Sequence, residues 1–131
     1  MTIRVVRDQQ APMRHVIRIG QNSLITDLSV EEGGGGSGPS PHDLYDAALG
    51  ACTALTALWY AKRKSIPVEG IEVSVERDAS HERAGIYRLR AELMLTGPLS
   101  AAQREELLRV AQKCPVHKLM TEVTTEISVT L

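Results

Sequence analysis

Residues 38–53 read GPSPHDLYDAALGACT, and this stretch decides the fold because it begins a long helix that carries a cysteine. Ser40 can cap the helix, and Pro41 suits the first helical position. Asp43 follows in the first turn, where a negative charge complements the positive end of the helix dipole. The pattern therefore predicts a helix that begins at about residue 40 and holds Cys52 in its interior.

The predicted helix continues well beyond this stretch. Apolar residues recur at helical spacing as far as Trp59, and the basic residues 62–64 followed by Pro67 indicate where the helix ends. A helix of about 24 residues results, which spans ~36 Å. Residues 44–61 carry a single charge, Asp46, but their many alanines make a membrane span a poor interpretation. Because the helix is apolar on nearly all faces, we expect it to be buried at the centre of the domain.

Segments with the alternation of strands lie on both sides of this helix. A second helix is predicted from Ser100, where Gln103 completes a capping box, and a short third helix can begin at Pro115. This order of elements predicts one α+β domain over residues 1–131, with antiparallel sheets around the long central helix. The expected strands cover residues 2–7, 15–20, 24–30, 71–76, 86–96 and 126–131.

A glycine-rich run, GGGGSGP, occupies residues 33–39 ahead of the helix. Glycine loses more backbone freedom than any other residue when it is ordered, so we expect a flexible linker or lid here. A phosphate-binding loop would need Gly-Lys followed by Ser or Thr, or a strand that leads directly into a dinucleotide fingerprint. No lysine follows the glycines, so we exclude a nucleotide-binding loop.

The composition excludes several classes of function. The 131 residues carry a net charge of −1, with acidic and basic residues mixed, and include one Trp, three Tyr and no Phe. A basic stripe and a set of stacking aromatics are both missing, so we expect no nucleic-acid partner. Residues 1–15 lack the apolar stretch of a signal peptide, which favours a cytoplasmic protein without a membrane partner.

Cys52 and Cys114 are the two cysteines of the chain, and any chemistry is expected to involve them. In a cytoplasmic protein such a pair is seldom a structural disulfide. Taken alone, Cys52 fits a small apolar residue packed inside a helix. Cys114 precedes Pro115, so it is predicted at a helix N-terminus, where backbone donors and the dipole lower the pKa of a thiol. An unreactive capping cysteine is the alternative at that position.

A metal site is a poor interpretation of the same residues. His117 stands three residues after Cys114. Together with Cys52 and His42 they would form a Cys₂His₂ set, but the spacings match no compact zinc module. We therefore expect neither a metal nor another cofactor.

Two motifs, taken together, resemble the OsmC/Ohr family: GPSPHDLYDAALGACT at 38–53 and KCPVHK at 113–118. The first, in which Gly-Pro-Ser-Pro leads into Ala-Leu-Gly-Ala-Cys-Thr, is similar to the YhfA-like branch of that family. The order of elements is similar over nearly the whole chain. The resemblance implies an intertwined homodimer in which the two cysteines meet near the subunit interface.

The resemblance also implies thiol-dependent reduction of organic hydroperoxides, a function in the response to oxidative stress. In the family the helix cysteine, here Cys52, attacks the peroxide and becomes a sulfenic acid. The second cysteine, here Cys114, resolves the sulfenic acid to a disulfide. A dithiol reductant of the lipoyl or thioredoxin type then restores both thiols.

The family activates its helix cysteine with an arginine from the N-terminal strands, held by a glutamate ten residues before that cysteine. Arg18 or Arg14 can fill the role of the arginine, and we favour Arg18. His42 occupies the position of the glutamate, which departs from the family pattern. A histidine can act as a base or a cationic partner of a cysteine. Asp43 can replace the missing carboxylate, although helix capping is its favoured role.

The departure at His42 keeps a second function open. The preferred function is a thiol peroxidase that acts on organic hydroperoxides. The alternative is a non-enzymatic protein on the same scaffold, which binds a small apolar ligand in the dimer cleft or senses redox state through its cysteines.

Overall fold

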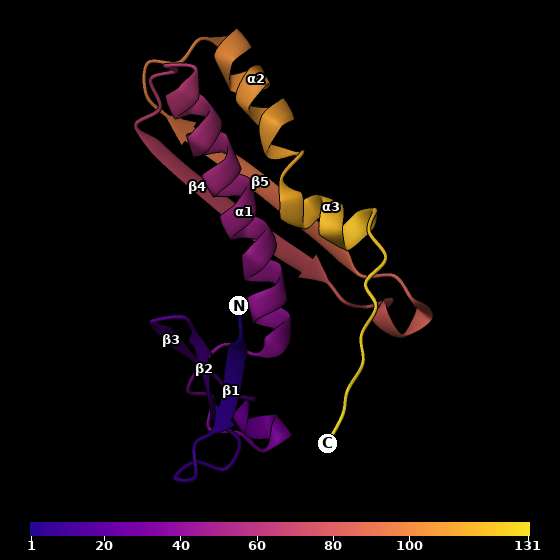
Figure 1. Cartoon of the computed structure of the whole chain (residues 1–131). Helices are drawn as coiled ribbons and strands as arrows, with labels where there is room; N and C mark the ends of the chain where they lie inside the picture. The colour runs from indigo at the N-terminus through magenta and orange to yellow at the C-terminus, as the bar shows by residue number, and fades with distance from the viewer. The chain divides into compact units, whose positions relative to one another are not determined.

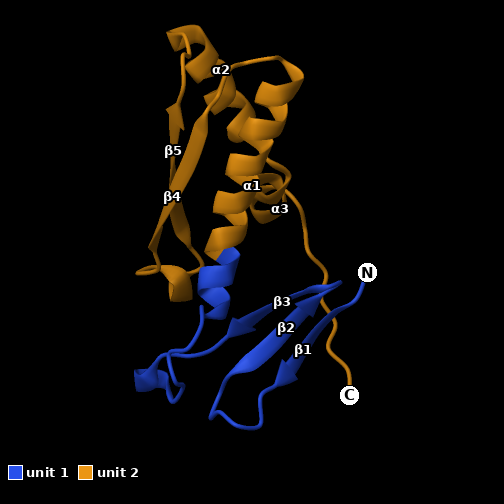
Figure 2. Ribbon diagram, turned by 90° about the vertical axis from the view of Figure 1, so that its left-hand side faces the viewer, with its two compact units in different colours: residues 1–45 blue, residues 46–131 orange.

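The computed structural model describes all residues from Met1 to Leu131, and these form two compact units, residues 1–45 and residues 46–131 (Figure 2). Helices and strands are mixed, and every strand pair is antiparallel (Figure 1). The predicted α+β class with antiparallel sheets and one long helix is confirmed. None of the helices has the length and apolar character needed to cross a membrane.

The first unit contains a three-stranded sheet with the strand order β1-β2-β3. The strands are β1 (Ile3–Arg7), β2 (His15–Ile19) and β3 (Asn22–Thr26). Gly20 has a left-handed φ of 60° in the tight turn between β2 and β3, a conformation that favours glycine. The apolar side chains of β1 are largely exposed, with Ile3 at 57% and Val5 at 56%. The sheet therefore leaves an apolar surface uncovered in this chain.

The third strand is shorter than predicted. A strand was expected over residues 24–30, whereas β3 ends at Thr26 and a 3-10 turn, η1 (Val30–Glu32), follows. Ser29 caps this turn, because its hydroxyl accepts a hydrogen bond from the Glu32 N–H at 3.3 Å. The strand ends where Asp27 turns its carboxylate toward the glycine-rich run instead of continuing the alternation.

The glycine-rich run is ordered around Asp27, so the prediction of a flexible linker or lid is wrong. The Asp27 carboxylate accepts hydrogen bonds from the N–H groups of Leu28 and Gly35. It also accepts from the N–H and the hydroxyl of Ser37, the latter at 2.6 Å. A Cβ on Gly34 would lie 2.1 Å from the carbonyl oxygen of Leu28, so this position requires glycine. Close backbone packing explains the glycine here, where conformational freedom was expected.

The long helix α1 (Pro41–Arg63) begins and ends close to the predicted limits. Ser40 and Asp43 cap it reciprocally: the Asp43 N–H donates to Ser40 Oγ at 3.1 Å, and the Ser40 N–H donates to Asp43 Oδ2 at 2.9 Å. One stripe of the helix is buried, while Leu55 and Trp59 on another face are 66% and 59% exposed. The expected burial on nearly all sides is therefore wrong for the single chain. The buried residues are Asp46, Thr53, Ala57 and Ala61.

The second unit places α1 beside a β-hairpin and two shorter helices (Figures 1 and 2). The strands β4 (Gly70–Asp78) and β5 (Arg88–Thr96) pair antiparallel, and a 3-10 turn, η2 (Glu82–Ala84), lies between them. Next come α2 (Ala101–Ala111) and α3 (Pro115–Thr121). The predicted capping box of Ser100 and Gln103 is present at the start of α2.

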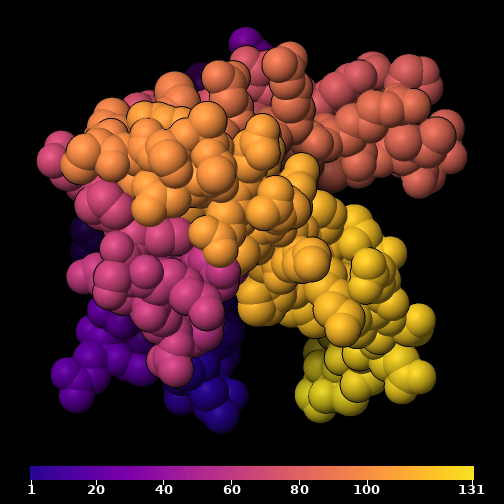
Figure 3. Space-filling view, turned by 90° about the horizontal axis from the view of Figure 1, so that it is seen from above, coloured from indigo at the N-terminus to yellow at the C-terminus, as the bar shows by residue number.

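The core of this unit lies between α1 and α2. Ala61, Ile66 and Leu107 are buried and form one apolar cluster. Figure 3, seen from above, shows the residues of α2 in orange against the pink residues at the end of α1. A hydrogen bond of 2.8 Å from the Tyr60 hydroxyl to Glu106 joins the two helices beside this cluster. Together these contacts hold α2 against α1. They therefore also position the segment that follows α2.

The chain end differs from the prediction. Residues 126–131 were expected as a final strand, but no strand forms after α3. Ile127 and Val129 are 81% and 92% exposed. Alternation of apolar and polar residues defines two faces, but a strand also needs a neighbouring backbone to pair with, and this segment pairs with none in the single chain.

Candidate active site

Cys52 lies near the middle of α1, just past the point where the helix comes closest to β4. A Cβ added to Gly50 would lie 3.1 Å from a methyl group of Val75 and 4.0 Å from one of Val73. Glycine therefore allows α1 to approach the hairpin at this level. Thr53, the next residue, is buried, whereas Cys52 on the neighbouring face is only partly buried. The Cys52 thiol is thus the more accessible of these two groups.

Cys114 is the N-cap of α3, as its position before Pro115 predicted. Its backbone is extended, and its Sγ accepts a hydrogen bond from the His117 N–H at 3.4 Å. The residue is fully buried, with 0% of its surface exposed. The end of α2 and the start of α3 therefore hold Cys114 with its sulfur turned into the unit.

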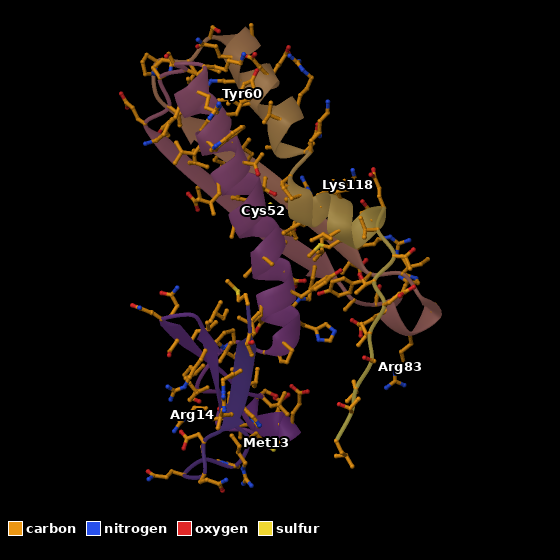
Figure 4. The ribbon with its side chains drawn as sticks, viewed as in Figure 1. Met13, Arg14, Cys52, Tyr60, Arg83 and Lys118 are labelled. Atoms are coloured by element: carbon orange, nitrogen blue, oxygen red, sulfur yellow. The ribbon has the colours of Figure 1, made fainter.

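The two cysteines meet, although they come from different helices. The Cys52 thiol is close enough to Cys114 to raise the pKa of that residue. Thr53 Oγ1 lies 3.9 Å from Cys114 Sγ, and Thr56 Oγ1 lies 3.9 Å from Cys52 Sγ. Figure 4 labels Cys52 midway along α1 and Lys118 on α3, the helix that Cys114 caps. Two thiols and two hydroxyls thus form one cluster, which we call the Cys-Thr cluster.

Burial reverses the predicted effect of the helix end on Cys114. Loss of hydration raises the pKa of Cys114, and the neighbouring Cys52 thiol raises it further. The hydrogen bond from the His117 N–H acts in the opposite direction, but burial is the largest influence. The predicted position of Cys114 is confirmed, but the prediction that this position makes it the activated thiol is wrong. At neutral pH Cys114 is a protonated thiol.

The arginines expected near Cys52 lie in the first unit. Arg18 is exposed in β2, paired in register with Arg4 of β1 and Ser23 of β3. Arg14 is partly buried and forms an ion pair with Asp8, with its Nη2 at 2.7 Å from the carboxylate. Arg14 is therefore already engaged by a carboxylate, while Arg18 has no such partner in the sheet, and a role for either in activating Cys52 stays a prediction.

His42 and Asp43 both lie in the first turn of α1. Ten residues separate His42 from Cys52, which corresponds to about 15 Å along the helix axis. This separation exceeds the reach of a hydrogen bond between the two side chains, so a direct action of His42 on Cys52 of the same helix has no support. The carboxylate of Asp43 accepts from the Ser40 N–H, which is the capping role favoured from the sequence.

His117 contributes its backbone N–H to Cys114, and no group of His, Cys, Asp and Glu side chains is arranged to hold a metal ion.

Sequence reasoning missed a second polar cluster on the buried stripe of α1. Asp46 is 7% exposed, and its carboxylate accepts hydrogen bonds from Arg77 Nε of β4 and, at 2.7 Å, from the hydroxyl of Tyr87. Burial, together with the hydrogen bond to Asp46, raises the pKa of Tyr87 to about 12. The signal was present in the sequence, because Asp46 is the only charged residue of a long apolar helical segment and a buried charge needs partners. These contacts attach α1 to the β-hairpin about 9 Å before Cys52.

A family model with the description OsmC-like protein matches residues 34–129, which include both cysteines. The chain belongs to the OsmC-like protein family. The OsmC-like fold agrees with the order of elements described above, and the resemblance found in the two cysteine motifs is confirmed at the level of this family. Among curated proteins no relative matches the chain.

Solved structures share the fold of this OsmC-like chain. An osmotic stress induced and detoxification response protein from Psychrobacter arcticus is 24% identical with a TM-score of 0.75, over 90% of this chain and 86% of that one. An OsmC like protein from Mycoplasma pneumoniae is 20% identical with a TM-score of 0.74, over 93% and 87%. The organic hydroperoxide resistance protein of Bacillus subtilis is 22% identical with a TM-score of 0.62, over 93% and 92%. At these identities the likeness establishes the fold.

Proposed function

We propose that the protein is a thiol-dependent peroxidase that reduces organic hydroperoxides through a cycle between a Cys52–Cys114 dithiol and a disulfide. The observation that carries the proposal is that α1 and the start of α3 bring the two cysteines together: Thr53, the neighbour of Cys52, contacts Cys114 Sγ at 3.9 Å, and the Cys52 thiol raises the pKa of Cys114. Membership of the OsmC-like family supports it, as does the fold shared with an organic hydroperoxide resistance protein.

The accessibility of the two sulfurs assigns their roles. Cys52 is partly exposed, so a hydroperoxide can reach it, whereas Cys114 is fully buried and protonated. A thiolate is the nucleophile in such reactions, and a buried sulfur that solvent-borne substrates cannot reach can react only with a neighbouring group such as an oxidised Cys52, giving up its proton in that step. Cys52 is therefore the attacking cysteine and Cys114 the resolving one.

Each step of the cycle balances. The Cys52 thiolate attacks one oxygen of the hydroperoxide, the O–O bond breaks, and the other oxygen leaves as an alcohol after it takes up a proton. Cys52 is then a sulfenic acid. The Cys114 sulfur attacks the Cys52 sulfur, a disulfide forms, and the hydroxyl leaves with the Cys114 proton as water. A dithiol of the lipoyl or thioredoxin type returns both thiols by exchange and becomes a disulfide itself.

The attacking thiolate requires stabilisation by a positive charge. The second unit places no charged side chain on Cys52. The Cys52 thiol makes no hydrogen bond or ion pair with a charged side chain. We assign the positive charge to Arg18, with Arg14 as the alternative, because the family takes an arginine from the N-terminal strands. His42 stands at the position of the family glutamate, with Asp43 beside it, and a contribution of either residue to the reaction is kept as part of the proposal.

Association of two copies completes the proposal. Ile3 and Val5 on β1 and Leu55 and Trp59 on α1 are about half exposed or more in one chain, and α1 is otherwise an apolar helix. Exposed apolar faces of this kind often mark an interface. A homodimer would cover them and would bring the N-terminal strands of one copy into the assembly around the other. Two free cysteines also suit a reducing compartment, so we place the protein in the cytoplasm.

A binding or redox-sensing protein is the alternative function. The observations that favour it are the lack of a charged partner for Cys52 within its unit and the presence of His42 at the glutamate position. The exposed face of α1 with Leu55 and Trp59 would then line a cleft for a small apolar ligand. In that case both thiols would react with hydroperoxides no faster than free cysteine.

The decisive experiment counts thiols after one turnover. Cumene hydroperoxide is added to the reduced protein, free thiols are counted, and disulfides are mapped by mass spectrometry. We expect rapid loss of two thiols per chain with a Cys52–Cys114 bond. The Cys52→Ser variant should lose none, while Cys114→Ser should accumulate a sulfenic acid that dimedone traps. Persistence of both thiols in the wild type would reject the peroxidase and favour the binding protein.

A further inference from the structure

The two threonines of the Cys-Thr cluster differ in what their hydroxyl protons do. Thr53 and Thr56 lie one turn apart on α1, and each is 3.9 Å from a different cysteine sulfur. A hydroxyl has one proton to donate and an oxygen that can accept. If the proton goes to another group, the sulfur can only donate to the hydroxyl oxygen; if it does not, the sulfur can accept the proton. The other hydrogen-bond partners of each hydroxyl therefore indicate whether the neighbouring sulfur donates or accepts.

The hydroxyl proton of Thr53 is used in a hydrogen bond to the helix backbone. Thr53 Oγ1 donates to the carbonyl oxygen of Leu49 at 2.8 Å, the common bond from a threonine to the turn before it. In its contact with Cys114 the Thr53 oxygen is therefore the acceptor, and the Cys114 S–H is the donor. Thr53 therefore has no proton left to donate to a Cys114 thiolate.

The hydroxyl of Thr56 has a different hydrogen-bond partner. Thr56 lies four residues after Cys52 on the same helix, and its hydroxyl makes its hydrogen bond with Cys52 Sγ. It does not bond to a backbone carbonyl as Thr53 does. Its proton is therefore available to the Cys52 sulfur, and donation stabilises that sulfur most when it is a thiolate, because hydrogen bonds to a charged acceptor are the stronger ones.

Other groups around Cys52 offer little competing stabilisation. Residues 47–61 of α1 carry no charge, and β4 approaches this part of the helix with Val73 and Val75. On α3 the side chains of His117 and Lys118 hydrogen bond with neither thiol, and His117 contributes only its backbone N–H, to Cys114. Cys114 is the titratable group in contact with Cys52.

We propose that the hydroxyl of Thr56 donates a hydrogen bond to the Cys52 thiolate, while the hydroxyl of Thr53 accepts one from the Cys114 thiol. Thr56 thus favours the ionised form of Cys52, and Thr53 gives Cys114 no equivalent assistance. Thr56 touches the reacting sulfur and is a catalytic residue of the proposed reaction, whereas Thr53, whose proton goes to Leu49, donates no hydrogen bond to the resolving cysteine. The consequence for catalysis rests on the proposed function, but the effect on thiol ionisation does not.

The test compares Thr56→Val with Thr56→Ser. Valine keeps the shape of threonine but removes the hydroxyl, and serine keeps the hydroxyl. The readout is the rate of iodoacetamide alkylation at Cys52 as a function of pH, followed peptide by peptide with mass spectrometry. We expect Thr56→Val to raise the pKa of Cys52 by about one unit, so that alkylation at neutral pH slows about tenfold. Thr56→Ser should restore most of the wild-type rate.

Thr53→Val is the matched control on the same helix. Its hydroxyl is predicted to act on Cys114 alone, so the pKa of Cys52 should not rise. Circular dichroism and the urea midpoint of each variant show whether the fold is kept, and Thr56→Ser covers the case in which valine disturbs it. An unchanged Cys52 pKa in Thr56→Val, or an equal rise in Thr53→Val, would overturn the proposal.

The rate of cumene hydroperoxide reduction separates this inference from the proposed function. If Thr56→Val raises the Cys52 pKa in a protein that does not consume hydroperoxide, the peroxidase is rejected and the role of Thr56 stands. If the wild type consumes hydroperoxide and Thr56→Val does so equally fast with an unchanged Cys52 pKa, the role of Thr56 is rejected and the peroxidase stands.

Discussion

Cys52 on α1 and Cys114 at the start of α3 influence each other's surroundings, since the Cys52 thiol raises the pKa of Cys114, yet they differ sharply in exposure: Cys52 is partly open to solvent, and Cys114 is completely buried. The difference arises from the elements that carry them. Cys52 lies beside the buried stripe of α1, while Cys114 caps α3 with its sulfur turned inward. Because only Cys52 is partly open to solvent, we expect Cys52 to react before Cys114.

The first prediction concerns this order. Under native conditions N-ethylmaleimide should modify Cys52 at least tenfold faster than Cys114, because reagent access to a fully buried sulfur requires local opening. Mass spectrometry of the two cysteine peptides over a time course measures both rates. In concentrated guanidinium the two rates should become similar. Faster modification of Cys114 in the folded protein would contradict the assignment of Cys52 as the attacking residue.

The second prediction links Cys114 to stability at alkaline pH. Burial raises the pKa of Cys114 above the ordinary value of 9.0, so the folded state retains its proton where the unfolded state loses it. The stabilising contribution is therefore fully present below about pH 9 and is lost as the pH rises through the folded pKa. Urea unfolding of wild type and Cys114→Ala from pH 7 to pH 10.5 measures this contribution. The free-energy advantage of the wild type should shrink above pH 9, and a constant difference would show that Cys114 ionises normally.

The third prediction concerns the attachment of α1 to the β-hairpin. Asp46→Asn removes the charge that Arg77 and the Tyr87 hydroxyl share, and it should lower the free energy of unfolding by about 1–2 kcal/mol, a value reduced because Arg77 is partly exposed. Tyr87→Phe should cost about 1 kcal/mol. Urea denaturation measures both. Glu76→Gln, an exposed acid on β4 next to Arg77, is the control and should change stability by less than about 0.5 kcal/mol. Equal effects of Asp46→Asn and Glu76→Gln would remove the special role of Asp46.

The helical part of the fold could be predicted from the sequence because its signals are local. Ser40, Asp43 and Ser100 act within one turn of their own helices, and Pro115 fixes where α3 begins. These caps depend on residue spacing and on nothing else in the molecule. The position of Cys114 at a helix start followed in the same way.

What could not be predicted depends on groups that are distant in the sequence. The pKa of Cys114 is set by burial and by Cys52, and neither is visible in the residues around Cys114. The glycine-rich run is ordered by Asp27, a residue that precedes it and that gave no local sign of this role. Residues 126–131 have the alternation of a strand, but alternation does not provide the second backbone that a strand needs.

The last prediction tests the Asp27 loop. Hydrogen bonds from the hydroxyl and the N–H of Ser37 hold the pKa of Asp27 at about 2, below its ordinary value of 3.8, so the loop is stabilised by this carboxylate above about pH 4 and loses that stabilisation as the pH falls through 2. Asp27→Asn replaces one accepting oxygen with a donor, which leaves the N–H groups of Gly35 and Ser37 short of a partner. Hydrogen exchange at these two amides should therefore become at least tenfold faster at neutral pH. Glu31→Gln, in the exposed turn before the loop, should leave both rates unchanged, because its side chain makes no hydrogen bond with the loop. Slow exchange retained in Asp27→Asn would mean that the glycine backbone holds the loop without the carboxylate, and the close contact of Gly34 with Leu28 would then be the group to test next.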